Sequence, residues 1–277
     1  MIRPVLVLGI ALACCVAQDE DPRAWIARGT EAFKAARYAE AARDFEQALV
    51  INPESVHARQ YLAVSYAVQY IPGAKTPDNA AYLAKARANF EKILELDPKN
   101  HTAVQYLASL SMQEAAGIES PADKRAKFEE ARKWYDRLAG IEPLNKEAPY
   151  NIGVIDWQEA YPEWLQARAD AGMKRKDAEE AGPITNQAIR ARLRTDAGPL
   201  WDDAVRQLQR ALDIDPQYEE AMAYMNLVVR ERADLADSPE EYARQIADAD
   251  AWVRKDLETK RARAVANQPS GERSGEQ

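Results

Sequence analysis

The stretch Val50-Ile51-Asn52-Pro53 decides the fold, because its pattern returns three times further along the chain. A variable residue is followed by an apolar residue, a polar residue and proline, and the later copies are Glu95-Leu96-Asp97-Pro98, Gly140-Ile141-Glu142-Pro143 and Asp213-Ile214-Asp215-Pro216. Neighbouring prolines are 45, 45 and 73 residues apart. Self-similarity at such intervals is typical of proteins built from stacked supersecondary units.

The residues before each proline repeat with the spacing of a helix. An alanine lies twelve residues earlier, and bulky apolar residues lie eight and fifteen residues earlier, which gives the sets Ala41, Ala86, Ala131 and Ala204, then Phe45, Phe90, Tyr135 and Leu208, then Tyr38, Leu83, Phe128 and Trp201. These intervals place the three sets on one helical face. The pattern therefore predicts a helix that ends just before each proline.

A second helix is predicted after each proline. Ten residues on lie Ala63, Ala108, Gly153 and Asn226, preceded by Leu62, Leu107, Ile152 and Met225. A small residue lets two helices approach closely, while its apolar neighbour packs between them.

This pattern resembles the tetratricopeptide repeat, a helix–turn–helix unit of 34 residues. The first unit matches best, although Arg28 replaces a residue that is usually apolar, and the matching residues are Trp25, Gly29, Ala32, Tyr38, Ala41, Phe45, Ala48 and Pro53. The resemblance implies an all-α fold, a right-handed α-solenoid of about five such repeats. It also implies protein binding without chemistry, with the first helices of the repeats lining a concave groove.

The predicted solenoid covers residues 22–265, with a polar tail at 268–277 that we expect to be disordered. The repeats are expected at 22–55, 56–100, 101–145, 146–218 and 219–265, the fourth with a helical insertion at 161–198. The second and third repeats are longer than 34 residues, so we expect elongated helices. Thr76-Pro77, Ser120-Pro121 and Ser238-Pro239 each predict a helix start, and the last predicts a closing helix over about 239–265.

The N-terminus has the features of an export signal. Residues 1–17 contain one arginine, an apolar run and small residues before an acidic stretch, so we expect a secretory signal peptide and a periplasmic or secreted protein. The run is shorter than the roughly 20 apolar residues that cross a bilayer. Ala11-Leu12-Ala13-Cys14 also resembles a bacterial lipobox, so lipidation of Cys14 is an alternative, and an uncleaved anchor is another.

Composition excludes several kinds of chemistry. The only cysteines are Cys14 and Cys15, and there are two histidines, so we expect no cofactor, no metal site and no thiol nucleophile in the folded part. The 277 residues carry 37 Lys and Arg against 45 Asp and Glu, which disfavours nucleic-acid binding. We expect membrane association only through a lipid anchor. The sequence has no glycine-rich phosphate loop, HExxH or GxSxG motif.

Asp156 occupies a position that normally faces the interior of a helix pair. A buried carboxylate requires a partner, and the insertion supplies Arg190, Arg192 and Arg194. The sequence therefore predicts an ion pair that docks the insertion. Solvent exposure of Asp156 and a ligand-binding role are the alternatives.

Polar and aromatic residues recur on the predicted first helices and form the candidate peptide-binding groove. They are Gln60, Tyr61, Val64, Gln105, Tyr106, Ser109, Tyr150, Asn151, Trp157 and Tyr224. Tyrosine offers large contact area at low entropic cost, and amide side chains can pair with an extended backbone. The alternative is that these tyrosines only pack between helices. The Lys/Arg clamp that the family uses for a C-terminal carboxylate is missing from these turns.

We therefore expect a non-enzymatic scaffold that binds a protein or peptide outside the cytoplasm. One alternative is a lipid-anchored assembly factor, like the tetratricopeptide lipoproteins of outer-membrane barrel assembly or pilus biogenesis. The other is a carboxylate-only enzyme that uses the insertion at 161–198.

Overall fold

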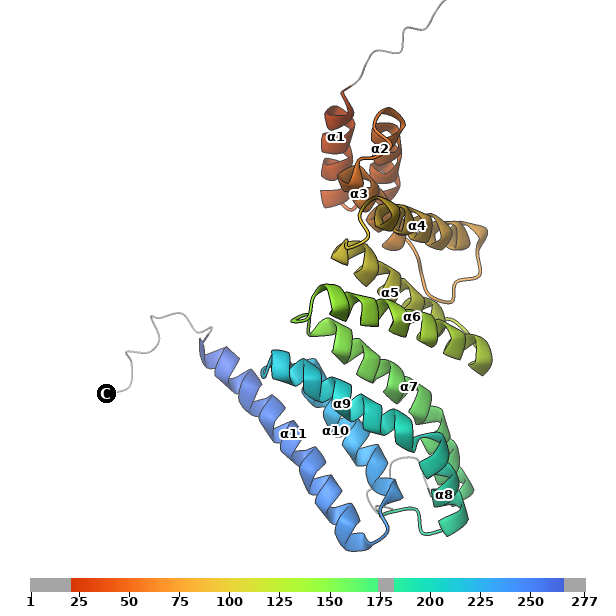
Figure 1. The fold of residues 1–277 in the computed structure, drawn as a ribbon, viewed down its shortest axis with the longest axis vertical. Coiled ribbons are helices and arrows are strands. Elements are labelled where there is room, and N and C mark those ends of the chain that lie inside the picture. Colours follow the sequence, from red (N-terminus) through yellow and green to blue (C-terminus); the bar gives the residue numbers. More distant parts are fainter. Residues whose placement is uncertain (1–20, 174–181, 267–277) are drawn as a thin grey trace, which may run out of the picture. The chain divides into compact units, whose positions relative to one another are not determined.

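The computed structural model describes residues 21–173 and 182–266, and all regular secondary structure within these ranges is helical (Figure 1). The predicted all-α class is therefore confirmed. The described residues divide into two compact units, the first ending at Leu96 and the second taking in the loop 71–75 and everything from Asp97 on.

The first unit contains two helix pairs. Helix α1 packs on α2 and α3 packs on α4, and their bounds are Pro22–Lys34, Tyr38–Ile51, Val56–Ala67 and Pro77–Leu96. Helices α2 and α3 also contact each other, so the two pairs share one core.

The second unit contains three further pairs: α5 with α6, α7 with α9, and α10 with α11. Helix α8 contacts both α7 and α9, and a short 3-10 helix, η2, follows α10. The bounds are α5 His101–Ala116, α6 Pro121–Ile141, α7 Glu147–Asp170, α8 Gln187–Asp196, α9 Gly198–Ile214, α10 Glu219–Arg232, η2 Ala233–Leu235 and α11 Pro239–Ala266.

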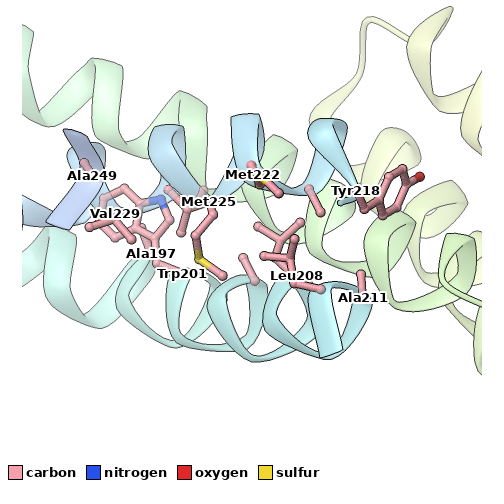
Figure 2. Packing of buried hydrophobic residues seen from close by; sticks show 14 of the residues in the cluster. Ala197, Trp201, Leu208, Ala211, Tyr218, Met222, Met225, Val229 and Ala249 are labelled. Carbon is pink, nitrogen blue, oxygen red and sulfur yellow. The ribbon is translucent and has the colours of Figure 1, made fainter. Parts of the chain in front are cut away.

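Most of the residues that repeat in the sequence are buried between paired helices. Phe45 and Phe90 are fully buried and Tyr135 nearly so, as their positions in the repeat predict. In the second unit, Trp201 and Leu208 of α9 pack with Met222 and Met225 of α10 (Figure 2). The long apolar face of α9 therefore supports both α7 and α10.

Glycine is required where paired helices come closest. A Cβ atom on Gly29 would lie 2.9 Å from the Phe45 ring, and one on Gly153 would lie 2.9 Å from Leu208 Cγ. Both distances are shorter than van der Waals contact, so each glycine makes room for the large side chain opposite it.

The predicted helix starts are confirmed. The hydroxyls of Thr76, Ser120 and Ser238 accept hydrogen bonds from backbone N–H groups three residues on, at 3.2, 3.4 and 3.1 Å. Proline follows each of them at the first helical position, where its missing N–H costs no hydrogen bond. Helices α4 and α6 are elongated, with 20 and 21 residues against 14 in α2.

The insertion begins as an extension of α7. This helix continues through Pro162 to Asp170, so the first part of the expected helical insertion belongs to α7 and a later part forms α8. Ile184 lies between them, is fully buried, and donates its backbone N–H to the carbonyl of Asp234 at 3.1 Å. Residues 174–181 lie outside the described ranges.

Asp156 is buried, but the partner predicted for it is wrong. Its side chain is 1% exposed and accepts a hydrogen bond from Arg132 Nη2 of α6, while Arg132 Nη1 lies 3.1 Å from Asp203 Oδ2 of α9. The ion pair therefore ties together α6, α7 and α9. It does not dock the insertion.

The insertion arginines find other carboxylates. Arg192 pairs with Asp170, and Arg190 and Arg194 lie 3.3 and 3.0 Å from Asp237. Asp170 lies about 21 Å along α7 from Asp156, at 1.5 Å per residue. Helix α8 packs near the Asp170 end of α7, so Arg192 pairs with Asp170 and not with Asp156. The order of the repeats could not reveal this offset.

Burial gives Asp156 an unusual acidity. Removal from water raises the pKa of Asp156 to about 7, helped by the nearby Asp203 carboxylate and opposed by Arg132. Its second oxygen, Oδ2, is buried and accepts no hydrogen bond among the described residues. The carboxylate is therefore costly to keep ionised inside the second unit.

The first prediction concerns the repeated aromatic core. Phe45→Ala and Phe90→Ala should each lower the free energy of unfolding by about 3–5 kcal/mol, because each removes a fully buried ring and leaves a cavity. Chemical denaturation followed by circular dichroism measures the loss. Val50→Ala is the control, since Val50 is 75% exposed, and should change stability by less than about 0.5 kcal/mol. Losses below about 1 kcal/mol at both phenylalanines would contradict this packing.

The second prediction concerns the pH dependence of Asp156. The folded-state pKa is raised, so between about pH 4 and pH 7 the unfolded state releases this proton first and the contribution of Asp156 to stability falls as the pH rises. Asp156→Asn keeps an acceptor for Arg132 and has no proton to lose. The variant should therefore gain about 1–3 kcal/mol relative to wild type across this range.

Urea denaturation at pH 4, 5.5 and 7 measures this difference. Asp248→Asn on the exposed surface of α11 is the control and should show no such trend. A pH-independent difference between wild type and Asp156→Asn would show that Asp156 titrates as an ordinary carboxylate.

Candidate functional site

Six aromatic side chains of the second unit form a continuous row of ring contacts. We call this set the aromatic row, and in order of contact its members are Tyr218, Tyr150, Tyr224, Trp157, Tyr161 and Trp164. Successive ring centroids are 5.0, 5.7, 5.3, 5.1 and 5.6 Å apart, with tilted or edge-to-face geometry. Tyr218 is buried and the other five are partly exposed.

Helical spacing explains why one helix can supply most of the row. Tyr150, Trp157, Tyr161 and Trp164 follow one another on α7 at intervals of seven, four and three residues, which keeps them on one side of the helix. Tyr218 is the residue directly before α10, and Tyr224 lies on that helix. The row therefore runs along α7, and its two other members come from α10 and the residue directly before it.

Buried carboxylates hold the polar edges of these rings. Trp157 Nε1 donates to both carboxylate oxygens of Glu231, at 3.0 and 3.1 Å, and Trp164 Nε1 donates to Asp234 Oδ2 at 2.7 Å. Glu231 and Asp234 are 6% and 2% exposed. Each indole ring is thus fixed at its N–H, as a ring must be if it is to present a constant face to a ligand.

Positively charged side chains lie over the rings at both ends of the row. Lys146 Nζ is 4.3 Å from the ring centroid of Tyr218 and pairs with Asp215 at 2.6 Å. At the other end, the Arg168 guanidinium is 5.3 Å from the ring centroid of Trp164 and pairs with Asp234 at 2.7 Å. Both cations are therefore neutralised by carboxylates of the chain itself.

The tyrosine hydroxyls of the row keep their protons at neutral pH. Burial raises the pKa of Tyr150, and the Tyr224 ring and the Glu220 and Glu147 carboxylates raise it further. Burial also raises the pKa of Tyr218, whose hydroxyl donates to Glu147 at 2.8 Å. Desolvation raises the pKa of Asp234, and Arg168 opposes that shift. The tyrosine hydroxyls of the row are therefore hydrogen-bond donors.

Three residues of the sequence-predicted groove belong to the aromatic row: Tyr150, Trp157 and Tyr224. Asn151 is partly exposed on the same helix, but its side-chain amide donates to the Glu147 carbonyl at 2.8 Å. On α5, Gln105 is exposed, while Tyr106 and Ser109 are partly exposed, and Ser109 accepts a hydrogen bond from Gln113 at 3.1 Å.

The groove residues predicted in the first unit lie in a different setting. Gln60, Tyr61 and Val64 of α3 are partly exposed. The ring of Tyr61 stacks on Phe45 at 5.3 Å and meets the edge of Phe33 at 5.5 Å. Tyr61 thus packs between α1, α2 and α3, which was the alternative interpretation of the tyrosines.

Sequence reasoning missed half of the aromatic row and both of its carboxylates. Tyr161, Trp164 and Tyr218 were not singled out, nor were Glu231 and Asp234. The spacing of Trp157, Tyr161 and Trp164 is itself a helical signal. An insertion that begins at Tyr161 divides this signal, whereas the structure has one continuous helix across that boundary.

The described residues contain no group of three or more His, Cys, Asp or Glu side chains placed to hold a metal ion. Within the same ranges, no helix combines the length and the apolar character that a membrane span requires.

Comparisons with known proteins identify the first repeat and the fold. Residues 22–55, which comprise α1 and α2, match the tetratricopeptide repeat family model. A search of curated proteins found no match. A crystal structure of the MamA protein is 13% identical, with 90% of this chain and 96% of that chain covered and a TM-score of 0.53.

A second structure, MamA residues 41 to the end from Desulfovibrio magneticus RS-1, is also 13% identical, with 89% of this chain and 98% of that chain covered and a TM-score of 0.54. At this identity the likeness concerns the fold. Residues 22–55 therefore contain a tetratricopeptide repeat, and the chain has an α-solenoid fold in which the later helix pairs repeat the helix–turn–helix design of this first pair.

Proposed function

We propose that the chain is a non-enzymatic protein-interaction scaffold, and that an extended segment of its partner binds along the aromatic row. The observation that carries this proposal is that five partly exposed rings touch in one line, with the two tryptophans fixed from behind by Glu231 and Asp234. Large rings that are already fixed give contact area at low entropic cost, which is why Trp and Tyr dominate binding hot spots.

Chemistry at this site is not supported by its carboxylates. Glu231 and Asp234 are buried and accept hydrogen bonds from indole N–H groups, so they serve to position rings. Asp170 of the insertion, and Asp237 just before α11, have lowered pKa values because Arg192 and Arg194 of the insertion hydrogen-bond to them. Paired acids of this kind stay ionised and lack the raised pKa that a general acid needs at neutral pH.

The groove is proposed to work outside the cytoplasm, which rests on the sequence of residues 1–17 alone. Those residues, including Cys14, lie outside the described ranges. A lipid-anchored assembly factor of the cell envelope is the second candidate, and it is favoured by the lipobox-like stretch Ala11-Leu12-Ala13-Cys14.

The third prediction distinguishes the two forms of export. The processed chain should begin at Gln18, because Cys15 and Ala17 are the small residues that a signal peptidase accepts before its cleavage site. Mass spectrometry of the chain recovered from soluble and membrane fractions measures its N-terminus. An acylated chain that begins at Cys14 and disappears in Cys14→Ser would contradict the prediction and support the anchor.

The fourth prediction concerns the aromatic row. Trp157→Ala should weaken partner binding by about 1–3 kcal/mol, because it removes the central ring of the row. The mature chain is immobilised and exposed to the periplasmic fraction of its own cells, and retained proteins are quantified for wild type and variant. A thermal melt of each variant shows whether the fold is kept.

Trp252→Ala is the matched control for this experiment. Trp252 is also partly exposed. Like Trp157, it packs against the buried cluster that contains Trp201 and Leu208, but it lies on α11, outside the row. It should retain partners as the wild type does. Equal retention by wild type and Trp157→Ala would show that the binding site lies elsewhere.

A further inference from the structure

We propose that Asp156 and Asp203 hold one proton between them, and that this proton makes the contact of α6, α7 and α9 sensitive to pH. We call this contact, formed by Asp156, Asp203 and Arg132, the acid joint. It is distinct from the aromatic row and does not depend on the proposed function. Helix α7 nevertheless carries four rings of the row, so the joint acts on the helix that presents the candidate site.

The two carboxyl groups of the acid joint share one guanidinium. Arg132 of α6 donates from Nη2 to Asp156 Oδ1, and its Nη1 lies 3.1 Å from Asp203 Oδ2. One planar group thus holds a carboxyl group of α7 beside a carboxyl group of α9, and these two side chains are within hydrogen-bonding reach of each other. A carboxylate has no hydrogen to donate, so such a pair forms a hydrogen bond only when one member is protonated.

The surroundings of the two groups place the proton on Asp156. The Asp156 side chain is 1% exposed and has one arginine partner, and its Oδ2 is buried and receives no hydrogen from any donor of the described residues. The Asp203 side chain is 27% exposed and has a second arginine, Arg206, at 2.9 Å. A buried charge with fewer partners is the costlier one, so Asp156 carries the proton on Oδ2 and donates it to Asp203.

This proton leaves near neutral pH. Burial raises the pKa of Asp156 to about 7, with Asp203 adding to the shift and Arg132 opposing it. An exposed aspartate releases its proton near pH 4, so an opened joint loses the proton before the closed joint does. The joint is therefore strongest in acid, weakens as the pH rises from about 4 to about 7, and changes little above that.

Other charged groups lie around α7, but their partners are different. Glu159, three residues further along α7, is a second titrating acid: burial raises its pKa, and Arg125 and Arg132 oppose the shift. From α10, Glu231 accepts the indole N–H of Trp157. The arginines of α8 pair with carboxylates near the other end of the helix. The charges that act on Asp156 are those of its two partners in the joint.

Nuclear magnetic resonance tests whether the proton is shared. The chain is labelled with ¹³C at its aspartate carboxyl carbons, which leaves Glu159 unseen, and the Asp156 signal is identified by its loss in Asp156→Asn. Its midpoint should lie near pH 7. Asp203→Asn keeps a side chain of the same shape but removes the competing charge, so it should lower the midpoint by about one pH unit or more.

The matched control is Asp202→Asn. Asp202 is the preceding residue of α9, is exposed, and pairs with Arg232 at 3.1 Å, outside the joint. Its replacement should leave the Asp156 midpoint unchanged. Thermal melts verify that each variant folds.

Hydrogen exchange tests whether the proton acts on helix packing. After correction for the intrinsic dependence of exchange on pH, protection of the α7 amides around Asp156 should fall at least tenfold between pH 5 and pH 7 and level off above pH 8. Asp156→Asn has no proton to lose and should remove this dependence. Helix α2, in the first unit, is the internal control.

Three results would overturn the inference. A midpoint near pH 4 would show that Asp156 holds no proton at neutral pH. A midpoint near pH 7 that Asp203→Asn leaves unchanged would mean that burial alone holds the proton and that it is not shared. Protection that stays constant while Asp156 titrates would mean that the proton does not act on the packing. The proposed function stands or falls separately, on partner retention by Trp157→Ala.

Discussion

Close packing within each helix pair is the constraint on which the rest of the structure depends. At Gly153 a single added carbon would lie 2.9 Å from Leu208, so the separation of α7 and α9 is set by a hydrogen atom in place of a side chain. Packed interiors deform little, and helices that interlock at this distance have a fixed relative rotation. That rotation determines which side of α7 faces α10. The aromatic row lies on that side, so its geometry follows from the core beneath it.

Buried carboxylates have two different roles in the second unit: one joins helices, and two others position indole rings. A carboxylate taken from water loses several kcal/mol of hydration, which hydrogen bonds and charge partners must offset. Asp156 meets Arg132 and the repelling Asp203, and the outcome is a raised pKa in a position that only connects helices. Glu231 and Asp234 instead accept hydrogen bonds from indole N–H groups, so their burial fixes two rings that are partly exposed to solvent. A buried acid that fixes a partly exposed ring therefore indicates a candidate site, whereas a buried acid that joins helices does not.

The helix pairs could be predicted from the sequence because the residues that pack between paired helices recur at regular intervals. Alanine, a bulky apolar residue and proline recur at fixed intervals, and the structure buries Phe45, Phe90 and Tyr135 accordingly. The insertion could not be predicted in the same way, since Pro162 usually ends a helix and here lies inside one. The partner of Asp156 and the roles of Glu231 and Asp234 depend on contacts between helices that are far apart in the sequence. Such contacts leave no periodic pattern, so they could not be predicted from residue spacing.

In the proposed function, the rings and the carboxylates behind them have separate roles. The rings offer contact area to an extended segment, whereas the carboxylates accept the indole N–H groups and fix the rings in place. Lys146 and Arg168 already occupy the ring faces at the two ends, and their own carboxylate partners keep them there. A segment bound as proposed would therefore meet the middle of the row, at Trp157 and its neighbours Tyr150 and Tyr224. Glu231 fixes the indole ring at the centre of that stretch, so the position of this contact is set before any segment arrives.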